Sequence, residues 1–201
     1  MMYLSRVFLQ PGKLNNAYEW HRALWSLFPD VERGSVSPFL YHMESINLAS
    51  GAQVLMQSSI EPVSGSAAVR VLATKPFPAS FKVGQRLAFQ LLANPTKSIS
   101  DTQNKANKKN QGKCRVPLVK EEEQCAWLQR KFAGAVNIDA LNIRNHAPLY
   151  FRKGNRAGKV VPVFFEGAFE VSDIEMVTDL WKNGIGPAKA FGCGLMMVRK
   201  I

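Results

Sequence analysis

The chain has few of the residues from which disulfide scaffolds and metal sites are built. Its 201 residues include three cysteines and three histidines, and the CxxC, HxxH and HExxH spacings do not occur. The odd number of separated cysteines (Cys114, Cys125, Cys193) argues against a disulfide framework and indicates a reducing, cytoplasmic environment. We therefore expect no metal site and no cofactor.

Long apolar runs and acidic residues are also scarce. No run approaches the roughly 18 apolar residues of a membrane span, and Arg6 interrupts the N-terminal segment, which is not typical of a secretory signal. Lys and Arg number 26 against 15 Asp and Glu, so the formal net charge is +11. This excess favours a polyanionic partner. Nucleic acid and an anionic membrane surface both fit this charge, and the absence of a long apolar run makes the membrane the weaker candidate.

The first half of the chain predicts one α+β unit. Apolar residues recur at steps of three and four over 15–28, which indicates a helix that Asn15 or Asn16 could cap. Residues 66–75 carry a weaker pattern. Aromatic and β-branched runs favour strands at 3–9, 39–43, 53–58 and 84–93. This order is that of a ferredoxin-like unit, the topology of RNA-recognition modules.

The second half repeats the pattern without visible sequence identity. Helices are expected at 119–133 and, opened by a capping box of Ser172 and Glu175, at 172–183. Residues 160–171 alternate as a half-buried strand does, and 195–201 favour a last strand. We therefore expect an α+β protein of two tandem ferredoxin-like domains with antiparallel sheets, at 1–95 and 115–201.

Between these units, residues 96–114 contain five lysines and no aromatic residue. They cannot bury enough apolar surface to offset chain entropy, so a mobile basic linker or loop is expected. A second basic stretch, 152–159, has the pattern of a hairpin whose tip could enter a groove of duplex RNA. The basic residues expected to bind RNA are Lys97, Lys105, Lys108, Lys109, Lys113, Arg115, Arg152, Lys153, Arg156 and Lys189.

A glycine-rich segment contains Gly184, Gly186, Gly192 and Gly194. It follows a predicted helix and precedes a predicted strand, the reverse of a phosphate loop, and it lacks the GK[ST] ending. ATP, GTP and dinucleotides are therefore poor candidates. Two interpretations stay open: the loop approaches an RNA backbone with the help of Lys189, or it caps the helix and packs against the sheet.

His21 lies three residues after Tyr18 and hence on the same helical face. A histidine on an apolar face is usually a core residue. An imidazole is also a suitable proton shuttle for RNA cleavage, in which the ribose 2′-OH attacks its own phosphate and no metal is required.

Motifs that run in order over nearly the whole chain resemble one family. These segments are YxxHxxLWxLFP at 18–29, FLYHME at 39–44, LLANPTK at 91–97, CRVPL at 114–118, AWLQRK at 126–131, FEG at 165–167, GIGPAK at 184–189 and GCGL at 192–195. With them the sequence resembles the CRISPR repeat-processing endoribonucleases of the type I-E system (the CasE type).

This resemblance implies two ferredoxin-like domains of the repeat-associated RNA-binding superfamily. It also implies metal-independent cleavage of CRISPR precursor RNA in the repeat stem-loop, by 2′-OH attack that leaves a 2′,3′-cyclic phosphate or 3′-phosphate and a 5′-OH. The protein would then stay on the mature guide RNA as a subunit of the surveillance complex. Tyr18 and His21 match the family's catalytic pair, with their acid and base roles open, and Lys159 is the candidate for a third role. The alternative is a non-catalytic RNA-binding subunit of a ribonucleoprotein.

Overall fold

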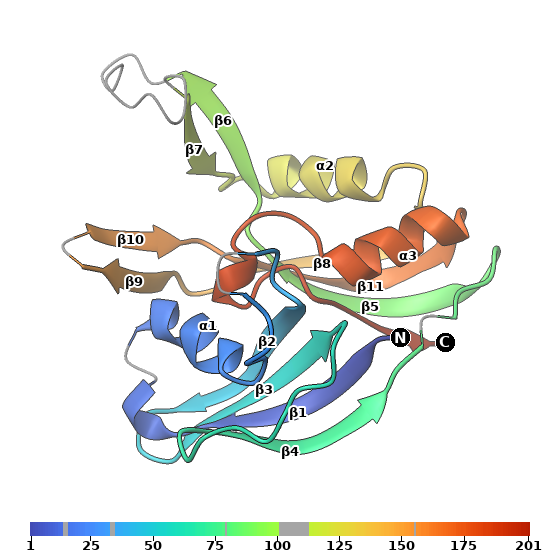
Figure 1. The fold of residues 1–201 in the computed structure, drawn as a ribbon. Helices are drawn as coiled ribbons and strands as arrows, with labels where there is room; N and C mark the ends of the chain where they lie inside the picture. The colour runs from blue at the N-terminus through green and yellow to red at the C-terminus, as the bar shows by residue number, and fades with distance from the viewer. Residues whose placement is uncertain (14–15, 33–34, 79, 101–112, 155) are drawn as a thin grey trace.

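The protein has two four-stranded antiparallel sheets, three α-helices and two short β-ribbons among the residues that the structure describes. This computed structural model describes residues 1–13, 16–32, 35–78, 80–100, 113–154 and 156–201. The predicted α+β class with antiparallel sheets is confirmed (Figure 1). Within the described ranges, no helix is long and apolar enough to cross a membrane.

The first sheet has the strand order β2-β3-β1-β4. Its strands are β1 (Tyr3–Leu9), β2 (Phe39–Asn47), β3 (Gly51–Ser58) and β4 (Val69–Pro76). Helix α1 (Ala17–Trp25) packs Trp20 and Leu24 against Val7, Val54 and Met56 of this sheet. The order is that of a ferredoxin-like unit. The weakly patterned segment forms edge strand β4, which follows β3 without an intervening helix in the described chain.

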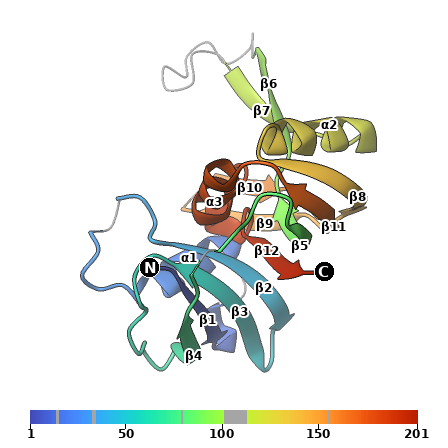
Figure 2. The same ribbon diagram turned by 90° about the vertical axis from the view of Figure 1, so that its right-hand side faces the viewer.

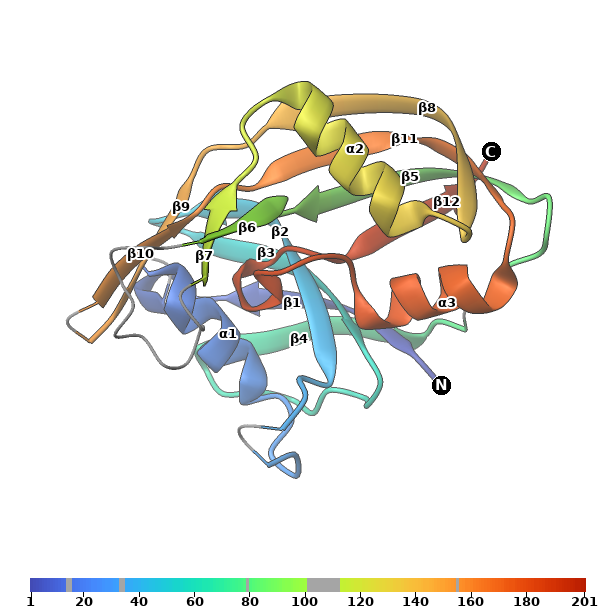
Figure 3. The same ribbon diagram turned by 90° about the horizontal axis from the view of Figure 1, so that it is seen from above.

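The second sheet has the order β12-β5-β11-β8. Its strands are β5 (Arg86–Ala93), β8 (Val136–Asn145), β11 (Val163–Val171) and β12 (Met196–Lys200). Helices α2 (Glu121–Phe132) and α3 (Ile174–Asn183) pack on one face of it (Figure 3). With β5 as its first strand, this unit has the complete ferredoxin-like order β-α-β-β-α-β.

The place of β5 differs from the expectation. The sequence pattern predicts the strand at 84–93 in the first unit, yet this strand pairs with β11 and β12 in the centre of the second sheet. Leu87, Phe89 and Leu91 belong to the same core as Phe132 and Phe165. Alternating apolar residues identify a strand but not the core that it joins, because that choice depends on partners far away in the chain.

The basic stretch 96–114 begins and ends in strands and is not a loop throughout. β6 (Thr96–Ser100) pairs with β7 (Lys113–Pro117) in a two-stranded ribbon. Backbone pairing satisfies the polar groups of these residues without an apolar core. Lys105, Lys108 and Lys109 lie outside the described residues. The second basic stretch does form the predicted hairpin, from β9 (Leu149–Lys153) and β10 (Arg156–Val160).

Helix α3 begins one residue later than the predicted capping box implies. Asp173, not Ser172, is the N-cap, and its Oδ1 accepts a hydrogen bond of 2.8 Å from the Met176 backbone N–H. The cap must have extended backbone directly before the first helical residue, and Asp173 has it, with φ −135° and ψ 123°.

The two sheets lie one above the other (Figure 2), and buried polar contacts join them. The Gln57 side chain of β3 donates to the carbonyl of Trp181 in α3 at 2.8 Å. The hydroxyl of Tyr41 in β2 donates to the carbonyl of Ala190 at 2.8 Å, in the short 3-10 turn η2 (Lys189–Phe191). η1 (Pro11–Lys13) is a second such turn, between β1 and α1. The segment after α3 is thereby held against the first sheet, where the candidate site lies.

Candidate functional site

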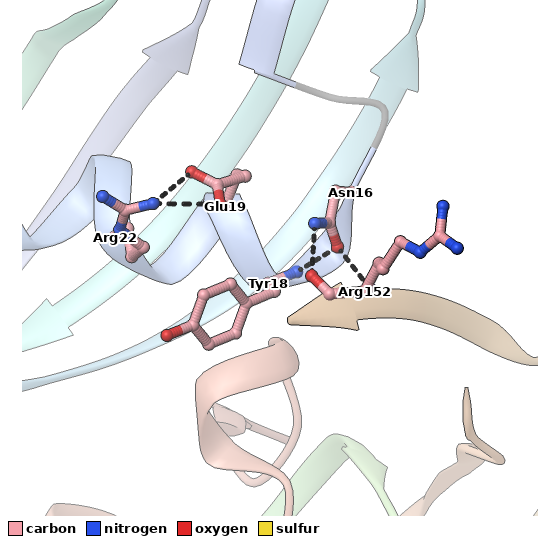
Figure 4. Close-up of polar contacts among 5 residues, drawn as sticks. All are labelled: Asn16, Tyr18, Glu19, Arg22 and Arg152. Atoms are coloured by element: carbon pink, nitrogen blue, oxygen red, sulfur yellow. Dashed lines mark hydrogen bonds and ion pairs between the residues drawn. The ribbon is translucent and has the colours of Figure 1, made fainter. Parts of the chain in front are cut away.

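The start of α1 lies against β9. Asn16 is the N-cap of the helix, and its Oδ1 accepts a hydrogen bond of 3.1 Å from the Tyr18 backbone N–H (Figure 4). The same amide group contacts Arg152: Oδ1 accepts from its backbone N–H at 3.1 Å, and Nδ2 donates to its carbonyl at 2.7 Å. The first turn of α1 therefore has a defined position relative to the basic hairpin.

His21 lies one turn further along α1 and is half-buried. Its ring centroid is 5.4 Å from that of Trp25 and 5.2 Å from that of Phe39. Burial lowers the pKa of the imidazole from its ordinary value, which favours the neutral form at pH 7. His21 thus packs on aromatic rings, as a core residue would, but one side of it remains accessible.

That accessible side lines a pocket of about 700 Å³ between α1, the start of β2, the end of α3 and η2. Lys182 and Lys189 line the same pocket. The Lys189 ammonium donates to the Asn183 carbonyl, and burial together with the charge of Lys131 lowers its pKa. An imidazole that can accept a proton therefore shares an open pocket with two lysines, a combination suited to a phosphate group.

Tyr18 precedes His21 by one turn on α1 and is half-buried. Its ring points away from the ion pair that Glu19 and Arg22 form at 3.0 Å (Figure 4). Tyr18 is not one of the described residues that line the pocket. A substrate that contacts both Tyr18 and His21 must therefore extend beyond the pocket along α1.

Lys159 does not share this pocket. It lies on β10, opposite Tyr150 of β9, and the next pair along the ribbon is Gly158 and Phe151. Because neighbouring residues of a strand face opposite sides, Lys159 projects from the face opposite Phe151. Phe151 packs on Phe191 of η2 with ring centroids 4.5 Å apart, so the Phe151 face is the one that contacts the site. Lys189 is thus the better placed lysine, and Lys182 was not predicted.

The β9–β10 hairpin presents Arg152 and Lys159 to solvent. The side chains of Lys153 and Arg156 are outside the described part of the structure, although their backbone continues the hairpin. Gly158 provides the room that Phe151 occupies, since a Cβ there would lie 2.5 Å from the Phe151 ring. The hairpin is therefore packed against η2 on one face and free to bind on the other.

The β6–β7 ribbon divides its basic residues between two faces. Lys113 and Arg115 are exposed on the face that also carries Ser98 and Ser100. Lys97 is on the other face, where its ammonium is 2.7 Å from a carboxylate oxygen of Glu123. The hydrogen bond from Lys97 holds the pKa of Glu123 below its usual value. Lys97 is thus already paired with a carboxylate, whereas Lys113 and Arg115 have no ion pair within the described chain. Both ribbons lie on the same side of the molecule as α1 (Figures 1 and 3).

Packing accounts for the glycines at 184–194. Gly184 is the C-cap of α3 with φ +72°, and a Cβ there would lie 2.7 Å from Leu40 Cδ1. Gly192 and Gly194 are buried, and the Gly194 N–H donates to the Leu92 carbonyl at 2.7 Å. A Cβ at Gly186 would contact the Trp127 ring. These positions fit the capping interpretation, and contact with an RNA backbone stays a prediction.

The other histidines lie apart from this pocket. His42 of β2 is half-buried, and burial together with the proximity of His146 lowers its pKa. In the described ranges, no three His, Cys, Asp or Glu residues form a group that could hold a metal ion.

The chain was compared with known proteins. The model of the family described as CRISPR associated protein matches residues 2–200. CasE, a CRISPR system Cascade subunit of Escherichia coli strain K12, is 41% identical over 97% of this chain and 98% of its own. The crystal structure of Cas6e from the same strain superposes with a TM-score of 0.85 at 40% identity, over 99% of this chain and 100% of that one.

A second structure, from Thermus thermophilus, shows Cse3 bound to an RNA that represents a pre-cleavage complex. It has a TM-score of 0.79 and 30% identity, over 98% of both chains. A curated Cse3 from that organism, 32% identical over 98% of this chain and 99% of its own, is named a CRISPR-associated endoribonuclease. The resemblance inferred from the motifs is thus confirmed along the whole chain, and so is the pair of ferredoxin-like domains. The chain belongs to the CRISPR-associated protein family, in the group that contains CasE and Cse3 of the type I-E system.

Proposed function

We propose that this protein is a metal-independent endoribonuclease that cleaves CRISPR precursor transcripts in the repeat stem-loop. The observation that carries the proposal is the position of His21: its imidazole lines an open pocket with Lys182 and Lys189. It belongs to α1, the helix at the end of the molecule where both basic ribbons lie (Figures 1 and 3). The similarity to Cse3, which is named an endoribonuclease and has been solved with RNA, supports the same assignment.

The reaction needs only groups of the RNA and this chain. The ribose 2′-oxygen attacks the adjacent phosphorus, the bond from phosphorus to the 5′-oxygen breaks, and a 2′,3′-cyclic phosphate and a 5′-OH result. One group takes the 2′-proton, and another donates a proton to the leaving oxygen. The lowered pKa of His21 favours its role as the acceptor, and Tyr18, one turn away, is the candidate donor. Lys189 would offset the charge that develops on the phosphate.

RNA binding is assigned to exposed cations of the two ribbons. Arg152 of the β9–β10 hairpin and Lys113 and Arg115 of the β6–β7 ribbon are exposed, and both ribbons lie at the end of the molecule that carries α1 (Figure 3). The β9–β10 hairpin lies between the β6–β7 ribbon and α1 (Figure 1), so a folded RNA that binds both ribbons would reach α1 by extending past the hairpin. After cleavage, the same contacts would keep the mature guide RNA bound. Since CasE is named a subunit of Cascade, we assign this chain to the corresponding surveillance complex.

The test uses the full chain, a repeat hairpin RNA and EDTA. His21→Ala should cut about 10²–10⁴-fold more slowly than the wild type while its RNA affinity stays the same. His42→Ala is the matched control, because it removes another half-buried imidazole outside the pocket. Mass analysis of the products should find a cyclic phosphate, and a single 2′-deoxy nucleotide at the cut should stop the reaction.

The packing of His21 between Trp25 and Phe39 favours the second candidate, a non-catalytic RNA-binding subunit. That function predicts RNA binding without cleavage by the wild type. Activity that disappears with EDTA would instead contradict the metal-independent chemistry.

A further inference from the structure

Asn16 joins two parts of the proposed active site that are far apart in the sequence. Its side chain hydrogen-bonds the backbone of Arg152, 136 residues away, and the first turn of α1 (Figure 4). The helix that Asn16 caps carries Tyr18 and His21, and Arg152 is the exposed cation of the hairpin that is assigned to RNA. The bridge consists of two hydrogen bonds to the hairpin and one to the helix.

An asparagine is the side chain that these bonds require. Arg152 offers one backbone donor and one backbone acceptor, and only a carboxamide presents an acceptor and a donor side by side. Asn16 thereby binds the free edge of β9 as a neighbouring strand would, while the same oxygen caps α1. Serine caps a helix comparably well, but its single hydroxyl cannot satisfy both groups of Arg152.

The hairpin that Asn16 binds is also attached to the pocket of His21 through η2. Phe151, next to Arg152, packs on Phe191 of η2, and η2 carries Lys189 of the His21 pocket. Tyr41 holds η2 through the Ala190 carbonyl. The amide bridge attaches the hairpin to α1 through hydrogen bonds, and Leu149 and Phe151 attach it through apolar packing on the core that α1 joins. If the bridge is lost, apolar packing still holds the hairpin near the helix, but no hydrogen bond from Asn16 fixes the position of β9 along α1.

We propose that Asn16 is a positioning residue of the RNA cleavage reaction: its bridge to Arg152 sets the RNA held by the hairpin in register with Tyr18 and His21. This inference rests on the proposed function, because it concerns the geometry of that reaction. A displacement of about 1 Å between reacting groups is enough to slow a reaction by about 10²-fold. The bridge should therefore affect the rate of cleavage in the bound complex much more than RNA affinity.

The test compares Asn16→Ser with the wild type in single-turnover cleavage of a repeat hairpin RNA at saturating protein. The expected result is a rate about 10–100-fold lower with an RNA Kd within about threefold. Amide hydrogen exchange should become faster at 149–160, because the β9 edge loses its partner. Asp173→Ala is the matched control: it removes a helix cap from α3, where the cap contacts no hairpin, and should leave the cleavage rate unchanged.

The outcomes separate this inference from the proposed function. Asn16→Ser with wild-type cleavage would overturn the inference alone. Loss of both RNA affinity and rate, with a Tm well below that of Asp173→Ala, would also overturn it, since Asn16 would then be needed for folding and not for positioning. A wild type that binds the RNA but never cleaves it would overturn the proposed function, and the inference with it.

Discussion

The two faces of the β6–β7 ribbon should contribute unequally to RNA binding. Lys113 and Arg115 are exposed and form no ion pair within the described chain, whereas the Lys97 ammonium is 2.7 Å from a carboxylate oxygen of Glu123. A lysine that already neutralises a carboxylate gains less from a phosphate, because it must give up one anion to bind the other. We therefore predict that the double variant Lys113→Ala/Arg115→Ala weakens RNA binding strongly, and that Lys97→Ala weakens it much less.

The magnitude follows from counterion release. Each neutralised phosphate adds about 0.7–0.9 to the slope of log K against log salt, which is a factor of about 5–8 at 0.1 M relative to 1 M salt. Two lost contacts should lower the slope by about 1.4–1.8 and the affinity at 0.1 M by about 25–60-fold. Lys97→Ala should change the slope by less than one contact does.

Fluorescence anisotropy with a labelled repeat hairpin, measured over a series of salt concentrations, gives both quantities. Lys200→Ala is the matched control, since it removes an exposed charge from β12, on the other side of the molecule from the ribbons (Figure 3). The reasoning is refuted if the double variant keeps the wild-type slope, or if Lys97→Ala reduces the slope as much as Lys113→Ala alone.

Two further predictions concern stability. Burial lowers the pKa of His21 and of His42, so these histidines take up protons in the unfolded chain before they do in the folded one as the pH falls through about 6.5. The Tm should therefore decrease between about pH 7.5 and 5.5. His42→Gln should weaken this pH dependence. A Tm that is constant or rises on acidification would contradict this. Gly184→Ala should cost about 1–3 kcal/mol of unfolding free energy in urea titrations, because its φ of +72° and ψ of 162° suit only glycine. Gly12→Ala, which has open space around its Cβ, should be close to neutral, and equal effects of the two would refute the packing interpretation.

Local patterns predicted most of the elements. The helix that carries His21 and both later helices lie, within a few residues at their ends, where apolar periodicity places them, and the 152–159 hairpin follows from its turn residues. The assignment of β5 was wrong because the neighbouring strand β4, exposed at many positions, carries little signal of its own. The strong pattern of β5 therefore made it the predicted fourth strand of the first unit, a place that β4 occupies in the structure.

The site was predictable only where it depends on a single element. Tyr18 and His21 share a helix, so their spacing identifies the pair. The approach of Lys182 and Lys189 to His21, and the bridge from Asn16 to Arg152, depend on how the second unit packs against the first. Sequence patterns within one element contain no information on such contacts. Lys182 had one signal, its place in the last turn of a predicted helix, but that position is equally typical of a residue that interacts only with the helix dipole.

The β6–β7 ribbon leaves the second sheet after β5 and returns to it before α2. Both of its ends are therefore held by the same unit, and its described residues at 97–100 and 113–115 are exposed, so they can change in charge without altering the buried core of that unit. The ribbon that we propose binds RNA can thus vary by itself, and α1, the proposed catalytic helix, belongs to the other unit and would not be altered by such changes.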